Sequence, residues 1–182
     1  MHTPEVLSAN VLHRYRIFAI VEKELRLPSG RTAVRQVVQH SGAVVIIPRL
    51  ADGCLLLIAQ YRFAVGEMLL EFPAGTLEPG EAPLDCAKRE LLEEMGYRAD
   101  HWRALGIMYP SPGYCDEKQY LFVASGLVAG HVAGDEDEIL EVKGLTAQEV
   151  ERVITDRALV DAKSIAAYAR AKLQGVLAEM SA

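Results

Sequence analysis

The stretch that decides the fold is residues 75–97, which reads GTLEPGEAPLDCAKRELLEEMGY. Its second half predicts a short helix over residues 83–95, because a proline stands in the first turn and a glycine follows the last. Successive helical residues rotate by about 100°. Glu90, Glu93 and Glu94 therefore fall within roughly 100° of arc and share one face of the helix.

An apolar stripe adjoins these carboxylates. Leu84, Ala87, Leu91 and Met95 recur at helical spacing and are expected to face the core. Like charges at i,i+3 and i,i+4 destabilise an isolated helix by about 0.2–0.5 kcal/mol per pair. A partner that neutralises these glutamates is therefore expected. Hard divalent cations such as Mg²⁺ suit carboxylate oxygens. The alternative is a solvated acidic face. The glycine-rich segment before the helix and the presence of Arg89 favour a metal-binding site over a solvated face.

Bulk properties limit the class of protein. The chain has 182 residues, half of them hydrophobic, which suits one domain with a small appendage. No apolar run approaches the ~20 residues of a membrane span, and no signal peptide is recognisable. Cys54, Cys86 and Cys115 lack metal-ligand spacing, which indicates free thiols and a cytoplasmic location. The net charge of −6 argues against a nucleic-acid partner.

Strands interleaved with helices predict an α/β layer structure. The N-terminal part is expected to form a hairpin of residues 15–27 and 32–39, and the turn Asp52-Gly53 is expected to join strands 43–47 and 54–61. Further strands are expected at residues 102–109, 119–123 and 141–145. Thr146 predicts a helix start, with Glu149 completing a capping box, and residues 162–177 predict one longer C-terminal helix.

The stretch resembles the Nudix box, the signature of the Nudix hydrolases. Eight positions agree with its pattern: Gly75, Glu81, Arg89, Glu90, Leu91, Glu93, Glu94 and Gly96. Tyr97 departs from it, because a small aliphatic residue is usual there. The resemblance implies a Nudix α/β/α sandwich with a mixed sheet over residues 41–182. In the related nucleoside diphosphate sugar and ADP-ribose pyrophosphatases, a segment like residues 1–40 is a small β domain that joins two subunits, which implies a homodimer.

The same resemblance implies roles for the helix residues. Glu90 and Glu94 would bind Mg²⁺, with Mn²⁺ as an alternative, together with the backbone carbonyl of Ala74. Glu93 would be a nearby supporting ligand, directly or through water, and is counted with the catalytic residues. Arg89, also counted with them, would orient the glutamates through salt bridges. Glu81 would brace the loop before the helix.

The subfamily is indicated by residues outside the box. Pro112, in the turn Ser111-Pro112-Gly113, lies sixteen residues beyond Gly96, as in ADP-ribose pyrophosphatases, and Glu117 matches an acid that contacts the distal sugar. The alternative is an ordinary turn between strands. The implied substrate-binding residues are Arg35, Arg62, Ser111, Glu117 and Phe18. Arg62 could instead pair with Glu67 or Glu71, and Phe18 could instead belong to the core.

A second acidic cluster spans residues 135–138. In the family a mobile loop here runs into a strand, and aligning that strand on Leu140 and Val142 makes Glu136 the catalytic base and Glu138 a further metal ligand. A shift of one residue would transfer these roles, so Asp135 and Asp137 remain alternatives.

The implied reaction is Mg²⁺-dependent hydrolysis of the diphosphate bond of ADP-ribose or another nucleoside diphosphate sugar. The products would be a nucleoside monophosphate and a sugar phosphate. One alternative is a hydrolase that removes unwanted nucleoside triphosphates, and another is a non-catalytic nucleotide-sugar sensor. Pro112 and the long N-terminal segment count against the first, and the complete set of box carboxylates counts against the second. The nucleobase and the sugar are not fixed by the sequence.

Overall fold

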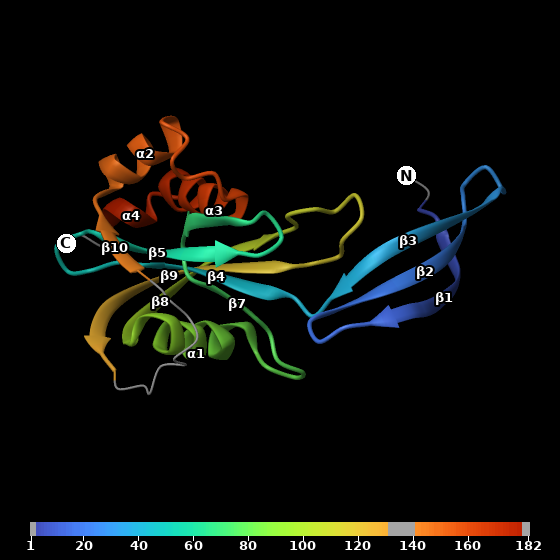
Figure 1. Ribbon diagram of the computed structural model, residues 1–182, viewed down its shortest axis with the longest axis horizontal. Helices are drawn as coiled ribbons and strands as arrows, with labels where there is room; N and C mark the ends of the chain where they lie inside the picture. The colour runs from blue at the N-terminus through green and yellow to red at the C-terminus, as the bar shows by residue number, and fades with distance from the viewer. Residues whose placement is uncertain (1–2, 131–140, 180–182) are drawn as a thin grey trace. The chain divides into compact units, whose positions relative to one another are not determined.

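The computed structural model describes residues 3–130 and 141–179, and the chain divides into two compact units (Figure 1). Unit 1 comprises residues 1–42 and 109–118, and unit 2 comprises residues 43–108 and 119–182. The segment with the Pro112 turn therefore belongs to the same unit as the N-terminal strands.

Unit 1 is built on a three-stranded antiparallel sheet. Its strands are β1 (Glu5–Arg14), β2 (Phe18–Arg26) and β3 (Thr32–His40), in the order β1-β2-β3. The expected hairpin is present as β2 and β3, whereas β1 was not predicted. Nearly all of β1 is exposed, so its sequence lacks the alternation of apolar and polar residues that marks a half-buried strand.

Residues 109–118 attach to β3 through backbone hydrogen bonds. The Val38 N–H donates to the Tyr114 carbonyl at 2.8 Å, and the Asp116 N–H donates to the Val38 carbonyl at 3.1 Å. The Asp116 side chain adds a contact, because its Oδ1 accepts from the His40 N–H at 2.8 Å. The Pro112 turn is thus held by the end of β3.

Within its described residues, 43–108, 119–130 and 141–179, unit 2 contains seven strands in two sheets. They are β4 (Ala43–Pro48), β5 (Leu55–Arg62), β6 (Glu67–Glu71), β7 (Ala74–Thr76), β8 (Tyr97–Met108), β9 (Gln119–Ala129) and β10 (Glu141–Leu145). One sheet has the order β7-β4-β9-β8 and the other β10-β5-β6. β4 and β9 are parallel and the remaining pairs are antiparallel, which confirms the expected mixed topology.

Helices cover both faces of the unit 2 sheets. α1 (Pro83–Met95) lies on one side, and α2 (Ala147–Thr155), α3 (Ala162–Leu173) and α4 (Val176–Glu179) lie on the other (Figure 1). β4 is buried on both faces. Val45 and Ile47 pack into one hydrophobic cluster, while Val44 and Ile46 pack into a second cluster that includes residues of α1. The α/β/α sandwich is therefore confirmed. Within residues 3–130 and 141–179, no helix is long and apolar enough to cross a membrane.

The expected hairpin of β4 and β5 is correct only at its turn. Arg49 and Leu55 form an isolated bridge, and the Leu50 N–H donates to the Cys54 carbonyl at 2.8 Å. Beyond this point β4 pairs with β7 and β9, whereas β5 pairs with β6 and β10. The two strands thus diverge into separate sheets.

Two helix predictions need correction. Leu84 does not face the core, because it is 36% exposed and Cys86 occupies the buried stripe instead. The C-terminal helix is not continuous over residues 162–177. α3 ends at Leu173, and Gly175, with φ 72°, separates it from α4. The capping box of α2 is present as predicted: Thr146 Oγ1 accepts from the Glu149 N–H at 3.2 Å.

Candidate active site

The helix α1 begins and ends where its sequence indicates. Pro83 occupies the first turn, and Gly96 adopts the left-handed conformation with φ 69° and donates its N–H to the Leu92 carbonyl at 2.9 Å. The buried residues of the helix are Cys86, Ala87, Leu91 and Met95. Their burial fixes the rotation of the helix, so that the Glu90 and Glu94 side chains border the core and Glu93 lies on the exposed side.

Arg89 gathers three of the predicted carboxylates. Its Nε and Nη2 donate to the two oxygens of Glu81 at 2.9 and 3.0 Å. Nη1 donates to Glu90 Oε1 at 2.7 Å and to Glu93 Oε2 at 2.9 Å. Glu81 in turn accepts from the Glu78 N–H at 3.0 Å, which ties the loop before α1 to the same guanidinium. This arrangement suits the orienting role predicted for Arg89 and the bracing role predicted for Glu81.

The pKa values of two carboxylates in this network, Glu81 and Glu90, shift in opposite directions. The hydrogen bonds from Arg89 lower the pKa of Glu81 to about 2, and the same bonds raise the pKa of Arg89. Burial raises the pKa of Glu90, although Arg89 opposes the shift. Glu90 is thus a carboxylate whose negative charge one guanidinium does not fully compensate.

The short strand β7 closes over two of the glutamates. The Ala74 N–H donates to Glu94 Oε2 at 3.2 Å. Gly75 lies directly against Glu90, because a Cβ at this position would overlap the carboxyl group. The antiparallel pairing of β7 with β4 holds this backbone at the sheet. Glu90, Glu94 and the Ala74 backbone therefore lie together.

These donors fit a hard divalent cation. Carboxylate and carbonyl oxygens are the ligands that Mg²⁺ prefers, and the partly uncompensated charge of Glu90 favours a positive ligand. Among residues 3–130 and 141–179, no group of three His, Cys, Asp or Glu side chains converges to hold a metal. The predicted base Glu136, the predicted ligand Glu138 and their alternatives Asp135 and Asp137 lie outside these ranges.

Four predicted substrate-binding residues belong to unit 1. Arg35 lies on β3, where its Nη1 donates to the Val34 carbonyl at 2.8 Å. Phe18 begins β2 and its ring contacts that of Tyr15, with centroids 4.8 Å apart. Ser111 begins the turn of residues 111–116, where its carbonyl accepts from the Cys115 N–H at 2.9 Å, and Glu117 follows this turn. Beside this turn lies a cavity of about 280 Å³, lined by Val37, Tyr109, Pro112, Gly113, Tyr114, Cys115 and Asp116.

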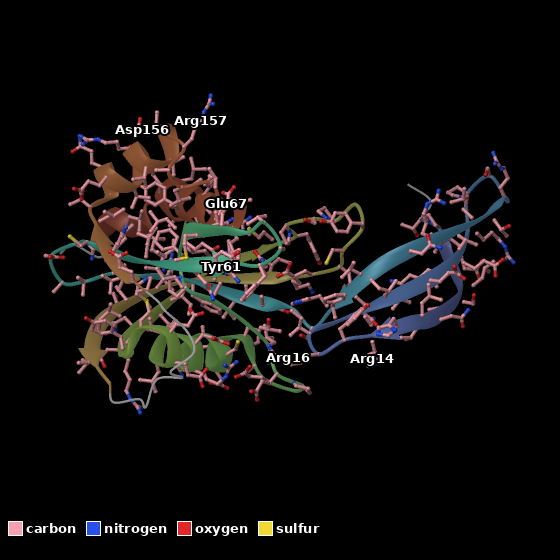
Figure 2. All side chains as sticks on the ribbon, viewed as in Figure 1. Arg14, Arg16, Tyr61, Glu67, Asp156 and Arg157 are labelled. Atoms are coloured by element: carbon pink, nitrogen blue, oxygen red, sulfur yellow. The ribbon has the colours of Figure 1, made fainter. Side chains whose placement is uncertain are left out.

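Arg62, at the end of β5, contacts a buried acid. Its Nε donates to Glu71 Oε1 at 2.8 Å and its Nη2 donates to Oε2 at 2.5 Å. Glu67 lies directly opposite Arg62 in the strand register, at the start of β6 (Figure 2), yet the guanidinium turns to Glu71. Of the two partners left open from the sequence, the structure therefore selects Glu71.

Sequence reasoning missed the surroundings of Glu71. Lys163 at the start of α3 forms an ion pair with the same carboxylate. Asp161, the N-cap of α3, accepts from the Ser164 N–H at 2.9 Å and from its hydroxyl at 2.6 Å. One signal was available in the sequence: Glu71 ends the apolar run Leu69-Leu70, so its side chain was a candidate for a buried charge.

Comparison with known proteins places the chain in a family. The NUDIX domain model matches residues 39–168. The chain is 35% identical over 164 residues to a methanol dehydrogenase activator of Bacillus methanolicus, covering 89% of each chain. It is 34% identical over 161 residues to an ADP-ribose pyrophosphatase of Bacillus subtilis, covering 87% of this chain and 86% of that one. A GDP-mannose pyrophosphatase of Yersinia enterocolitica is 32% identical over 188 residues, covering 95% and 94%.

A solved structure agrees with this placement at the level of the fold. The crystal structure of an ADP compounds hydrolase superposes with a TM-score of 0.85 at 24% sequence identity, covering 100% of this chain and 98% of the other. The chain belongs to the Nudix family.

Proposed function

We propose that the protein hydrolyses the diphosphate bond of ADP-ribose or another nucleoside diphosphate sugar in a reaction that depends on Mg²⁺. Membership of the Nudix family, together with relatives named as pyrophosphatases, makes it a hydrolase of pyrophosphate bonds. The observation that carries the proposal is the placement of Glu90 and Glu94 against the Ala74–Gly75 backbone, with Arg89 donating to Glu90. The names of the relatives support a nucleotide sugar as the substrate.

In this reaction Glu90, Glu94 and the Ala74 carbonyl would hold the metal, joined by Glu138. When bound, Mg²⁺ supplies charge neutralisation at the diphosphate and lowers the pKa of a bound water. Arg89 keeps Glu90 and Glu93 in place through the bonds described above.

The attacking water loses its proton to Glu136 in this proposal. Arginine suits phosphate oxygens because its planar fork stays charged, which supports phosphate binding by Arg62 and Arg35. Phe18 would stack on the base, and Ser111 and Glu117 would contact the remaining part of the substrate. The products are a nucleoside monophosphate and a sugar phosphate, which for ADP-ribose are AMP and ribose 5-phosphate.

The proposed active form is a homodimer joined through the N-terminal β segment, residues 1–40. Apolar side chains exposed on its strands support this assignment: Val6, Val11 and Leu12 on β1 are 55, 49 and 54% exposed, and Val34 on β3 is 48% exposed. A three-stranded sheet with so much apolar surface gains stability from a further partner. All three cysteines are free thiols, which suits a reducing, cytoplasmic compartment.

A panel of substrates tests the activity. ADP-ribose, GDP-mannose, ADP-glucose and nucleoside triphosphates are incubated with the protein and Mg²⁺, Mn²⁺ or EDTA, and the nucleoside monophosphates and sugar phosphates that are released are separated and measured by anion-exchange chromatography. We expect turnover of at least one nucleotide sugar with Mg²⁺ and none with EDTA. Glu94→Gln should lower kcat by orders of magnitude. The control Asp85→Asn removes an exposed carboxylate of the same helix and should retain activity. Turnover of nucleoside triphosphates alone would contradict the proposal.

A further inference from the structure

Glu71 is a charged side chain in the interior of unit 2. Its side chain is 1% exposed, yet it ends β6 immediately before the segment that leads into β7. Acidic side chains are almost never fully buried unless they are paired. Its partners therefore indicate why this position carries an acid.

Two cations from different elements hold the Glu71 carboxylate. Arg62 on β5 binds both oxygens at 2.8 and 2.5 Å, and Lys163 on α3 binds Oε2. Lys163 is only 12% exposed and also pairs with Asp161 at 3.0 Å. Burial raises the pKa of Glu71, but the bonds from Arg62 and Lys163 outweigh it and lower the pKa overall. The carboxylate is therefore a charged anchor with a fixed orientation.

The same end of α3 also holds the backbone that follows Glu71. Ser164 is fully buried, and its hydroxyl oxygen accepts from the Phe72 N–H at 2.8 Å. Two residues later the Ala74 N–H binds Glu94, and Gly75 lies against Glu90. The start of α3 thus fixes the end of β6 that carries Glu71, immediately before the strand β7 that contacts the helix glutamates.

Arg62 is more exposed than Glu71, the carboxylate that holds it. Its side chain is 37% exposed, whereas Glu71 is buried. Nε and Nη2 are directed at Glu71, and Nη1 donates to no acceptor within the described ranges 3–130 and 141–179. A guanidinium fixed along one edge keeps its charge and a further edge available for a second anion.

We propose that Glu71, anchored by Lys163, is a positioning residue that fixes the guanidinium of Arg62 for the diphosphate group of the substrate. This inference rests on the proposed function for its substrate, and on the Arg62–Glu71–Lys163 contacts for its geometry. Glu71 affects diphosphate binding only by orienting Arg62, and Glu71 itself does not contact the substrate.

A double-mutant cycle tests the assignment. Glu71→Gln, Arg62→Ala and the double variant are compared for KM and kcat with ADP-ribose. They are also compared for the dissociation constant of methylenediphosphonate, a diphosphate analogue that does not hydrolyse, at a fixed excess of Mg²⁺. We expect Glu71→Gln to raise KM and the dissociation constant about three- to tenfold, as for one weakened charged hydrogen bond, with little change in kcat. In the Arg62→Ala background the same substitution should change the dissociation constant less than about twofold, because coupled residues are not additive.

The control is Glu151→Gln, which removes another carboxylate held by a lysine of α3, Lys172, at 2.7 Å. It should leave the dissociation constant unchanged. If Glu71→Gln does not fold, the same cycle is run with Lys163→Gln, which removes the second anchor and should act in the same direction.

The outcomes separate the two proposals. The positioning role is overturned if folded Glu71→Gln, or Lys163→Gln in its place, leaves the dissociation constant of methylenediphosphonate unchanged. It is also overturned if the substitution raises this constant equally in the Arg62→Ala background. Either result assigns Glu71 to stability alone. A wild type that turns over no nucleotide sugar but shows the cycle with methylenediphosphonate refutes the proposed substrate and leaves the positioning role intact.

Discussion

Gly75→Ala should inactivate the enzyme by displacing a carboxylate while the fold persists. Gly75 does not have a positive φ, so backbone strain does not require glycine there. The requirement comes from packing. A Cβ at residue 75 would overlap Cγ, Cδ and Oε1 of Glu90.

The size of the effect follows from what Glu90 would lose. Its side chain is only 12% exposed, so the carboxylate has little room to move without breaking the 2.7 Å bond from Arg89 Nη1. Overpacking a well-packed site costs about 1–3 kcal/mol of stability. Altering even the partners of a metal ligand costs about 10–100-fold in affinity or activity, so displacing Glu90, the proposed ligand itself, should lower kcat at least about 100-fold.

The assay compares kcat with ADP-ribose at saturating Mg²⁺ and the melting temperature of Gly75→Ala with those of Gly144→Ala. Gly144 is a matched control, because a Cβ there would meet Leu56 Cδ2 at an ordinary 3.6 Å and no positive φ is present. The control should retain kcat. Full activity of Gly75→Ala at an unchanged melting temperature would refute the reasoning, since Glu90 would then be able to leave its position without consequence.

Three further predictions concern other parts of the chain. Glu136→Gln should lower kcat with little change in KM; a fully active variant, with Asp135→Asn or Asp137→Asn inactive, would show that the base lies one residue away. Sedimentation should show a homodimer at micromolar concentration, and a monomer would contradict the role given to the N-terminal segment. The depressed pKa of Glu81 contributes stability above about pH 4.5 that is lost as the pH falls toward about 2. Chemical unfolding of Glu81→Gln should therefore show a smaller acid-induced loss than wild type, and parallel curves would exclude this contribution.

Features that depend on local sequence were predicted closely. The bounds of α1 agree with the expected residues 83–95, because proline, glycine and the helical period all act within the segment. The capping box of Thr146 and Glu149 was likewise predictable, since both partners lie within one turn. The contact of Arg89 with Glu93 follows from the same helical spacing, because the two residues stand at i and i+4.

Features that depend on distant residues were not predictable. The divergence of β4 and β5 is set by their pairing with β9 and β10, which lie far along the chain. Glu71 meets Lys163 across 92 residues, and nothing in either local sequence connects them. Leu84 satisfied the helical period of the apolar stripe, yet it lies beyond the edge of the packed face, and burial there is decided by the neighbouring layers.

The charge of the candidate site explains why Arg89 and a metal would act together rather than as alternatives. Arg89 has five N–H donors, and they are engaged by Glu81, Glu90, Glu93 and the Thr76 carbonyl. One guanidinium therefore serves three carboxylates, those of Glu81, Glu90 and Glu93, which leaves two negative charges in excess within this network. Burial raises the pKa of Glu90 despite this arginine. Arg89 thus fixes where the carboxylates lie, and the remaining charge is the electrostatic reason why the proposed reaction requires divalent cations.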